Sequence, residues 1–147
     1  MKEMQTAAQA MGLRLHPAEV STEDGLEDAF VAMNKAGVQA LILLTDSIFF
    51  TQRKRTIDLA SKYRLPAMYF FQVFVEEGGL MSYGPSDADL FHRAAGYVDR
   101  ILKGTKPGEL PVEQPTKFDL YINLRTAKGL GLEIPFQLQQ RADALIE

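Results

Sequence analysis

Hydroxyl, amide and carboxylate side chains stand next to aromatic rings at three places in this sequence, and these positions are the best suited to bind a ligand. Such a mixture suits a small polar molecule that carries an amine and an apolar part. The carboxylate of Asp46 would meet an ammonium group, the hydroxyls a carboxylate, and the rings a side chain. We therefore predict a ligand site that consists of Thr45, Asp46 and Ser47, of Phe71 and Gln72, and of Ser82 and Tyr83.

A structural explanation also exists for these residues. The segment 45–47 has the residue types that cap a helix, and Phe70, Phe71 and Phe74 have the type that fills a core. The sequence leaves both explanations open for any single residue, whereas three such groups at one edge of a sheet favour a ligand site.

Other kinds of chemistry find no support in the residue pattern. Neither His16 nor His92 has a nucleophile at a spacing typical of catalysis, and no cluster of His, Asp or Glu has metal-ligand spacing. Gly78 and Gly79 lie between an expected helix and an expected strand, so they indicate a helix end rather than a phosphate-binding loop. We expect a protein that is not an enzyme and that has neither a metal ion nor a cofactor.

Composition narrows the class of protein further. The chain has 147 residues, enough for one domain, and 46% of them are hydrophobic, enough for a packed core. Its net charge of -3 and its one short basic cluster, 53–55, argue against nucleic-acid binding. It has no cysteine, which excludes disulfides and thiolate metal sites. Residues 1–5 show no signal-peptide pattern, so we expect a chain without an export signal.

The candidate residues need elements that bring them together. Hydrophobic spacing and capping residues predict helices at 3–12, 21–35, 49–63, 73–77, 86–102, 126–130 and 135–146. Apolar runs predict strands at 13–20, 38–44, 66–70, 80–83 and 118–122, of which 38–44 is typical of a strand buried on both faces. This alternation predicts a Rossmann-like α/β fold with a three-layer parallel sheet, which places the three groups at the carboxyl edge of the strands.

Several segments resemble one protein family. The most specific are 74–85, FVEEGGLMSYGP, and 110–118, LPVEQPTKF, and further similarity lies at 40–50, 62–69 and 94–104. They resemble the ABC-transporter substrate-binding proteins of the tryptophan-binding, TrpX-like group, which have a type I periplasmic-binding fold. The resemblance implies two Rossmann-like lobes that close on a ligand between them.

The chain has about half the length that this family implies. The resemblance therefore implies that residues 1–147 form a single α/β domain. This domain would be the second lobe together with the segments that return to it, and the first lobe would be absent. The residues at Thr45 and at 71–72 differ from those expected in close relatives, so ligand identity does not transfer. Position by position, the resemblance places the ligand wall of this lobe at Thr45 and Asp46, Phe71 and Gln72, and Ser82 and Tyr83.

The family implies the solute-binding component of an ABC transporter, which binds an amino acid or a similar small organic molecule and acts with an ABC permease. We expect the intact protein to be periplasmic or extracellular and membrane-associated, and this chain to be a truncated or fragment form. The alternative is a cytosolic ligand-sensing or oligomerisation domain with the same fold. The missing export signal favours this alternative, whereas the lack of a DNA-binding helix pair counts against it.

The helix expected at 86–104 carries a wide apolar stripe. In an intact relative it would pack on the first lobe, and left bare it would expose more apolar surface than soluble monomers usually do. The helix could fold back onto its own sheet, or two chains could pair. We favour a homodimer through helix 86–102, whose stripe consists of Leu90, Phe91, Ala94, Ala95, Val98, Ile101 and Leu102.

Overall fold

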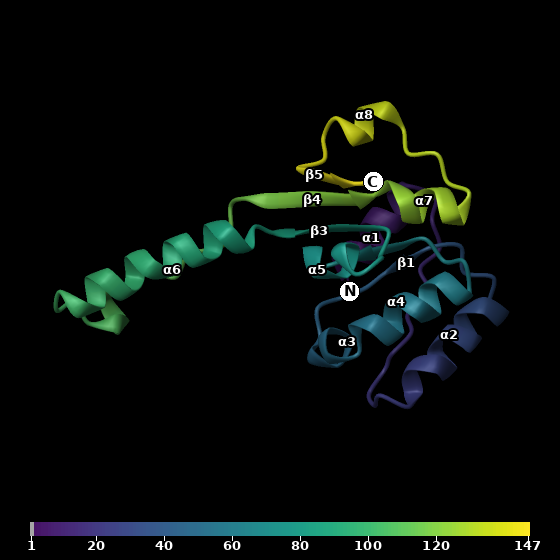
Figure 1. Ribbon diagram of the computed structural model, residues 1–147. Helices are drawn as coiled ribbons and strands as arrows, with labels where there is room; N and C mark the ends of the chain where they lie inside the picture. Colours follow the sequence, from purple (N-terminus) through teal and green to yellow (C-terminus); the bar gives the residue numbers. More distant parts are fainter. Residues whose placement is uncertain (1) are drawn as a thin grey trace.

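A five-stranded sheet forms the centre of the computed structural model, which describes residues 2–147 (Figure 1). The strands follow one another across the sheet in chain order, and every neighbouring pair is parallel except the antiparallel pair of the third and fourth strands. This confirms the predicted α/β fold and adds one antiparallel pair to the expected parallel sheet. The strands are β1 Leu41–Ile42, β2 Ala67–Tyr69, β3 Met81–Pro85, β4 Phe118–Asn123 and β5 Ala144–Ile146.

Helices follow most strands, as the sequence pattern predicts. The expected helix 49–63 is divided at Gln52, whose backbone leaves the helical region between α3 and α4. Glycines with positive φ follow α2 and α6, at Gly37 and Gly104, because this conformation ends a helix at little cost to a residue without a side chain. The helices are α1 Lys2–Ala10, α2 Gly25–Lys35, α3 Ser47–Thr51, α4 Arg53–Lys62, α5 Gln72–Glu76, α6 Asp87–Leu102, the 3-10 turn η1 Pro107–Glu109, α7 Leu124–Leu130 and α8 Phe136–Gln139.

Two predicted strands differ from the structure. The segment 13–20 is irregular, and Leu13 is exposed. Within 38–44 only Leu41–Ile42 is a strand, and Ile42 and Leu44 are 57% and 50% exposed although Leu43 is buried. The expectation of burial on both faces is therefore wrong, because the core residues of α2 and α4 pack only on the face that carries Leu43.

The predicted C-terminal helix 135–146 is also wrong. The helix α8 ends at Gln139, and residues 144–146 form β5 beside β4. The reason is a pair of hydrogen bonds at Asp143, whose backbone N–H donates to the Leu120 carbonyl while its carboxylate accepts from the Leu120 N–H. This clamp aligns the apolar end of the chain with β4, and tertiary pairing overrides the helical pattern.

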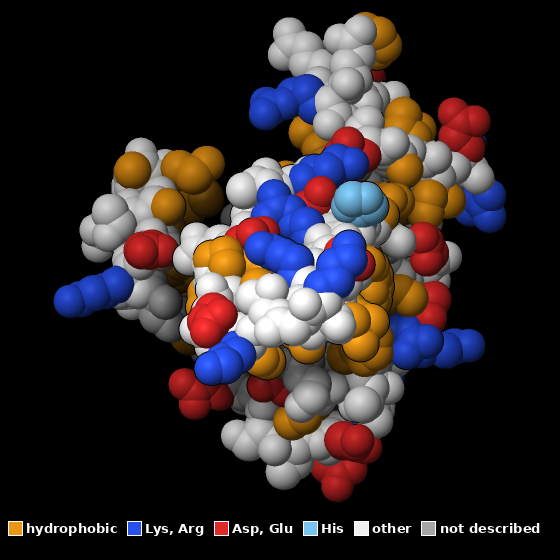
Figure 2. Space-filling view, turned by 90° about the vertical axis from the view of Figure 1, so that its left-hand side faces the viewer, with side chains coloured by type: hydrophobic (Ala, Val, Ile, Leu, Met, Phe, Trp, Pro, Cys, Tyr) orange, Lys and Arg blue, Asp and Glu red, His pale blue; other side chains and the backbone are white. Residues whose placement is uncertain are grey.

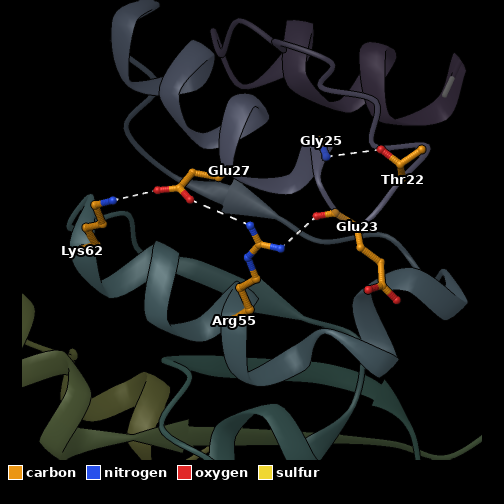
Figure 3. A network of polar contacts seen from close by, with 6 residues as sticks. All are labelled: Thr22, Glu23, Gly25, Glu27, Arg55 and Lys62. Carbon is orange, nitrogen blue, oxygen red and sulfur yellow. Dashed lines mark hydrogen bonds and ion pairs between the residues drawn. The ribbon is translucent and has the colours of Figure 1, made fainter.

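The core lies between the sheet and helices α2, α4 and α5. Phe30 of α2, Ile57 of α4 and Phe74 of α5 are buried in one cluster with Leu43 and Tyr69 of the strands. A surface network joins α2 to α4 at its margin (Figure 3): Glu27 contacts the Lys62 ammonium at 2.9 Å and the Arg55 guanidinium at 3.8 Å, and Arg55 also donates to the Glu23 carbonyl.

The helix α6 stands away from the sheet as an arm, together with the segment that returns along it (Figure 1). We call residues 86–117 the arm. The return segment is held to α6 by the Tyr97 hydroxyl, which donates to the Pro111 carbonyl at 2.6 Å, and by Arg93, which contacts Glu113 and Thr116. No residue of α6 is buried, so the helix does not fold back onto its own sheet. Among residues 2–147, no helix is long and apolar enough to cross a membrane.

Candidate ligand-binding site

The three predicted groups lie at one edge of the sheet. β1 pairs with β2 at Ile42 and Met68, and β2 pairs with β3 at Tyr69 and Ser82. Because these strands are parallel and in contact, the segments beyond their carboxyl ends are neighbours. One detail differs from the expectation, since Ser82 and Tyr83 lie inside β3 rather than in a loop after it.

Asp46 caps a helix at this edge. Its Oδ1 accepts a hydrogen bond from the Ile48 N–H at 2.9 Å, and its extended backbone places it at the N-terminus of α3. Thr45, Asp46 and Ser47 are all exposed. The structural explanation of Asp46 thus holds, and the exposed carboxylate remains open to a ligand, so its role in binding stays a prediction.

The aromatic residues divide into core and surface. Phe70 and Phe74 are buried, with ring centroids 5.1 Å apart, as the structural explanation predicts. Phe71 is half-buried and meets Phe50 edge to face at 5.9 Å. The exposed ring of Phe50 extends the apolar surface of the candidate site by one residue that the sequence analysis did not include.

Tyr83 presents its ring to solvent. It is 57% exposed and stacks on Phe118 of β4 at 5.6 Å, with 25° between the ring planes. The two residues are diagonal neighbours across the antiparallel ladder, since Tyr83 pairs with Leu120 and Pro85 pairs with Phe118. Phe118 was missed because only the pairing of β3 with β4 brings it beside Tyr83.

On the face of β3 and β4 opposite to the Tyr83 ring lies a polar hollow of about 10 Å³, large enough for one water molecule. Gln72 and Ser82 line it together with Asp119 and Tyr121, two residues that the sequence analysis did not name. The Asp119 Oδ1 is buried and has no hydrogen-bond partner among residues 2–147, although the Lys117 ammonium lies 3.6 Å away. Burial is the main cause that raises the pKa of Tyr121 above its usual value, and the charge of Asp119 is the second.

Gly84 allows β3 to approach the end of β2. A Cβ atom at this position would lie 2.2 Å from the Phe70 carbonyl oxygen, a distance that non-bonded atoms do not adopt. The glycine therefore fixes the spacing between Phe71 on one strand end and Tyr83 on the next.

The arrangement is that of an open wall with one carboxylate, the hydroxyls of Thr45 and Ser47, and rings, whereas Ser82 is buried. His16 and His92 are exposed and lie outside it. Within residues 2–147, no group of three or more His, Asp or Glu side chains is placed to hold a metal ion. A wall of this kind can hold a small molecule by hydrogen bonds and apolar contact on one side.

Comparison with known proteins gives one family and several solved structures. The family model described as ABC transporter substrate binding protein matches residues 1–146. No curated protein matches the chain. A conserved domain protein from Vibrio cholerae has 26% sequence identity and a TM-score of 0.88, and the match covers 99% of this chain and 49% of that one.

Two further structures share the fold. An ABC domain from Streptococcus pneumoniae in complex with L-Trp has 23% identity and a TM-score of 0.87, with coverage of 99% and 50%. A ligand-free, open substrate-binding protein with adhesive properties from Clostridium difficile has 18% identity and a TM-score of 0.68, with coverage of 99% and 48%. The chain thus spans about half the length of these structures.

Proposed function

Because the chain belongs to the ABC transporter substrate-binding protein family, we propose that it supplies one wall of a site for an amino acid or a similar small organic molecule. The observation that carries this proposal is the open edge of three adjacent parallel strands, where Asp46 follows β1, Phe71 follows β2 and Tyr83 lies within β3. A carboxylate for the ammonium group and rings for the side chain match the two ends of such a ligand.

The ligand class has support from a structural neighbour. The Streptococcus pneumoniae domain with the same fold is in complex with L-Trp. Exposed rings at Phe50, Tyr83 and Phe118 would suit an aromatic or aliphatic side chain in the same way. We infer that amino acids with apolar side chains are the first candidates.

The other wall of the site would come from residues outside this chain. The matched structures are about twice as long, and the hollow that Gln72 and Ser82 line has a volume of only about 10 Å³. A complete binding protein would close a second lobe on the ligand and deliver it to an ABC permease outside the cytoplasm. This chain alone would hold the same ligand weakly, because one wall makes only half of the contacts.

An NMR titration of the labelled chain with L-Trp, L-Leu and L-Glu tests the proposal. We expect shifts confined to 45–47, 71–72 and 82–84, largest for L-Trp. The variant Asp46→Asn keeps a good helix cap but loses the charge, so it should keep the fold and lose most of the response. The variant Asp46→Ala loses both. Equal titrations of wild type and Asp46→Asn would remove Asp46 from the site, and the absence of any shift would refute the ligand class.

The second candidate, a cytosolic sensing or oligomerisation domain, has one observation in its favour. The arm exposes a large apolar stripe, which suits an interface between subunits. The genes beside this one distinguish the two candidates, since a permease gene and an ATPase gene would support transport. Neighbouring genes for a regulated enzyme would support sensing.

A further inference from the structure

A second hollow, of about 210 Å³, lies at the opposite edge of the sheet, where β2 and β3 begin. Its walls come from the C-terminal end of α4, the turn at Gly78 and Gly79, and the C-terminal end of α7. It shares no lining residue with the candidate ligand wall. An apolar cavity of about 150 Å³ can hold benzene, so this hollow has room for a single ring with a polar substituent.

Tyr69 forms the inner end of this hollow. The residue is only 2% exposed, its ring stacks on Phe74 at 4.8 Å, and a Cβ at Gly79 would lie 2.6 Å from the ring. Its hydroxyl makes no hydrogen bond among residues 2–147, and the residue lines the hollow. Burial raises the pKa of Tyr69, so the hydroxyl remains a neutral donor. Buried tyrosine hydroxyls usually have a partner, and this one lacks it.

Arg64 stands at the mouth of the hollow. Its φ of 52° is positive, a conformation that favours glycine at the end of a helix such as α4. The side chain crosses the mouth and donates one hydrogen bond to the Leu130 carbonyl at 3.1 Å. A guanidinium group carries five N–H donors, so donors remain for a ligand.

Four of the carbonyl acceptors around this hollow already have donors. The carbonyls of Ala60 and Ser61 at the end of α4 accept from Leu65 and Arg64. The Gly78 carbonyl accepts from the Thr126 hydroxyl at 2.9 Å, and the Leu130 carbonyl accepts from Arg64. The exposed lining is more polar than apolar, and Ile57, Leu65 and Leu80 supply its apolar part.

We propose that this hollow is a second binding site, for a small carboxylate with a flat or branched apolar body. The carboxylate would accept from Arg64 at the mouth and from Tyr69 inside, and the apolar body would lie against Ile57 and Leu80. This site is independent of the proposed amino-acid wall, which lies at the other edge of the sheet.

Benzoate is the probe that tests the site, with neutral benzyl alcohol as its uncharged match. In NMR titrations of the full chain, benzoate should shift the amides of 64–65, 78–79 and 129–131, and benzyl alcohol should bind much more weakly. Arg64→Gly should weaken benzoate binding by about tenfold or more, because hydrogen bonds to a charged group are among the strong ones. Glycine suits the positive φ, so this variant should melt at the wild-type temperature or above it.

Two further variants complete the test. Tyr69→Phe keeps the stacked ring, removes only the hydroxyl, and should weaken benzoate binding several-fold. Arg141→Gln removes an exposed arginine outside the hollow and should leave binding unchanged. Wild-type affinity in both Arg64→Gly and Tyr69→Phe would overturn the proposal. So would equal binding of benzyl alcohol, or benzoate shifts confined to 45–47 and 71–72.

Discussion

At the scale of single residues, structural contacts hold the residues of the candidate wall in place. Gly84 leaves room for the Phe70 carbonyl, and Asp46 anchors the start of α3. Both residues have a structural task that is visible in their contacts. A ligand would bind to the side-chain surface of Asp46, Phe71 and Tyr83 that these structural contacts leave free.

Gly84→Ala should destabilise the protein by about 1–3 kcal/mol, because the added methyl group has to displace the backbone of Phe70. Denaturant unfolding measures the change. Gly96→Ala is the matched control, since it lies inside α6 with nothing within 4 Å of the new Cβ, and should stabilise by up to about 1 kcal/mol. An unchanged stability in Gly84→Ala would mean that the two strand ends can separate freely.

Tyr83→Ala should weaken the binding of an aromatic or aliphatic ligand more than that of a small polar one. The exposed ring stacked on Phe118 is the reason for this expectation. The same NMR titration, with L-Trp against L-Ser, measures the difference, and Tyr83→Phe is the control that keeps the ring. Equal losses for both ligands would indicate a general disturbance of β3 rather than a ring contact.

At the scale of elements, ion pairs and apolar packing make unequal contributions to the position of α2. Phe30 and Met33 are buried against the core, whereas the Glu27 network lies at the surface. Exposed ion pairs contribute little to stability, so the packing of α2 does not depend on them. The network instead adds a small dependence on pH and salt.

Glu27→Gln should make stability slightly less sensitive to acid. The hydrogen bond from Lys62 is the main cause that lowers the pKa of Glu27 in the folded protein. A group whose pKa is lowered by folding stabilises at pH values above its unfolded pKa, and this contribution is lost as the pH falls through the folded pKa. Urea unfolding of wild type and variant at pH 7 and at pH 3 should therefore show a small difference at pH 7 that is reduced at pH 3.

The contribution of the Glu27–Lys62 pair to stability is also lost at high pH. Glu27 raises the pKa of Lys62, mainly through their hydrogen bond, so this contribution is present below the unfolded pKa of Lys62 and is lost as the pH rises through the folded one. High salt should reduce the difference between wild type and Glu27→Gln at neutral pH. A difference that is unchanged at high salt would show that the substitution alters packing instead.

Elements with local signals were predictable from the sequence, and those that depend on distant pairing were not. The helix α6 begins after Ser86 and ends before Gly104, and both residues mark its limits in the sequence. By contrast, β5 exists because Asp143 pairs with Leu120, more than twenty positions earlier. Phe118 and Asp119 were missed for the same reason, since only the antiparallel pairing of β4 with β3 places Phe118 beside Tyr83 and Asp119 in the hollow beside Ser82.

At the scale of the whole molecule, the arm is the feature that exposes the most evident apolar surface. Phe91 and Leu102 are 76% and 81% exposed, and Figure 2, which faces the end of the arm, shows hydrophobic side chains among several Lys and Arg side chains. Such a surface favours a partner. We expect another lobe to cover this surface in a longer protein, and we predict that a second copy covers it in this chain alone.

Light scattering at micromolar concentration should show a homodimer. Phe91→Glu should shift it toward the monomer, because the charge would lie in the apolar interface. His92→Glu introduces the same side chain on the neighbouring exposed position and serves as the control. A wild-type monomer would refute the dimer, and an equal response of both variants would place the interface elsewhere.

The pairing at the base of the arm has one more consequence. Pro85 and Phe118 are partners in the antiparallel ladder, and the Ser86 N–H donates to the Lys117 carbonyl at 3.0 Å. The arm therefore leaves the sheet and returns to it at adjacent points, as an extended loop between two hairpin strands. A two-residue Asn-Gly turn could replace residues 86–117 without changing the order of the strands. The remaining chain would be a minimal lobe in which the candidate wall and the second hollow keep their supports, without the segment through which we predict association.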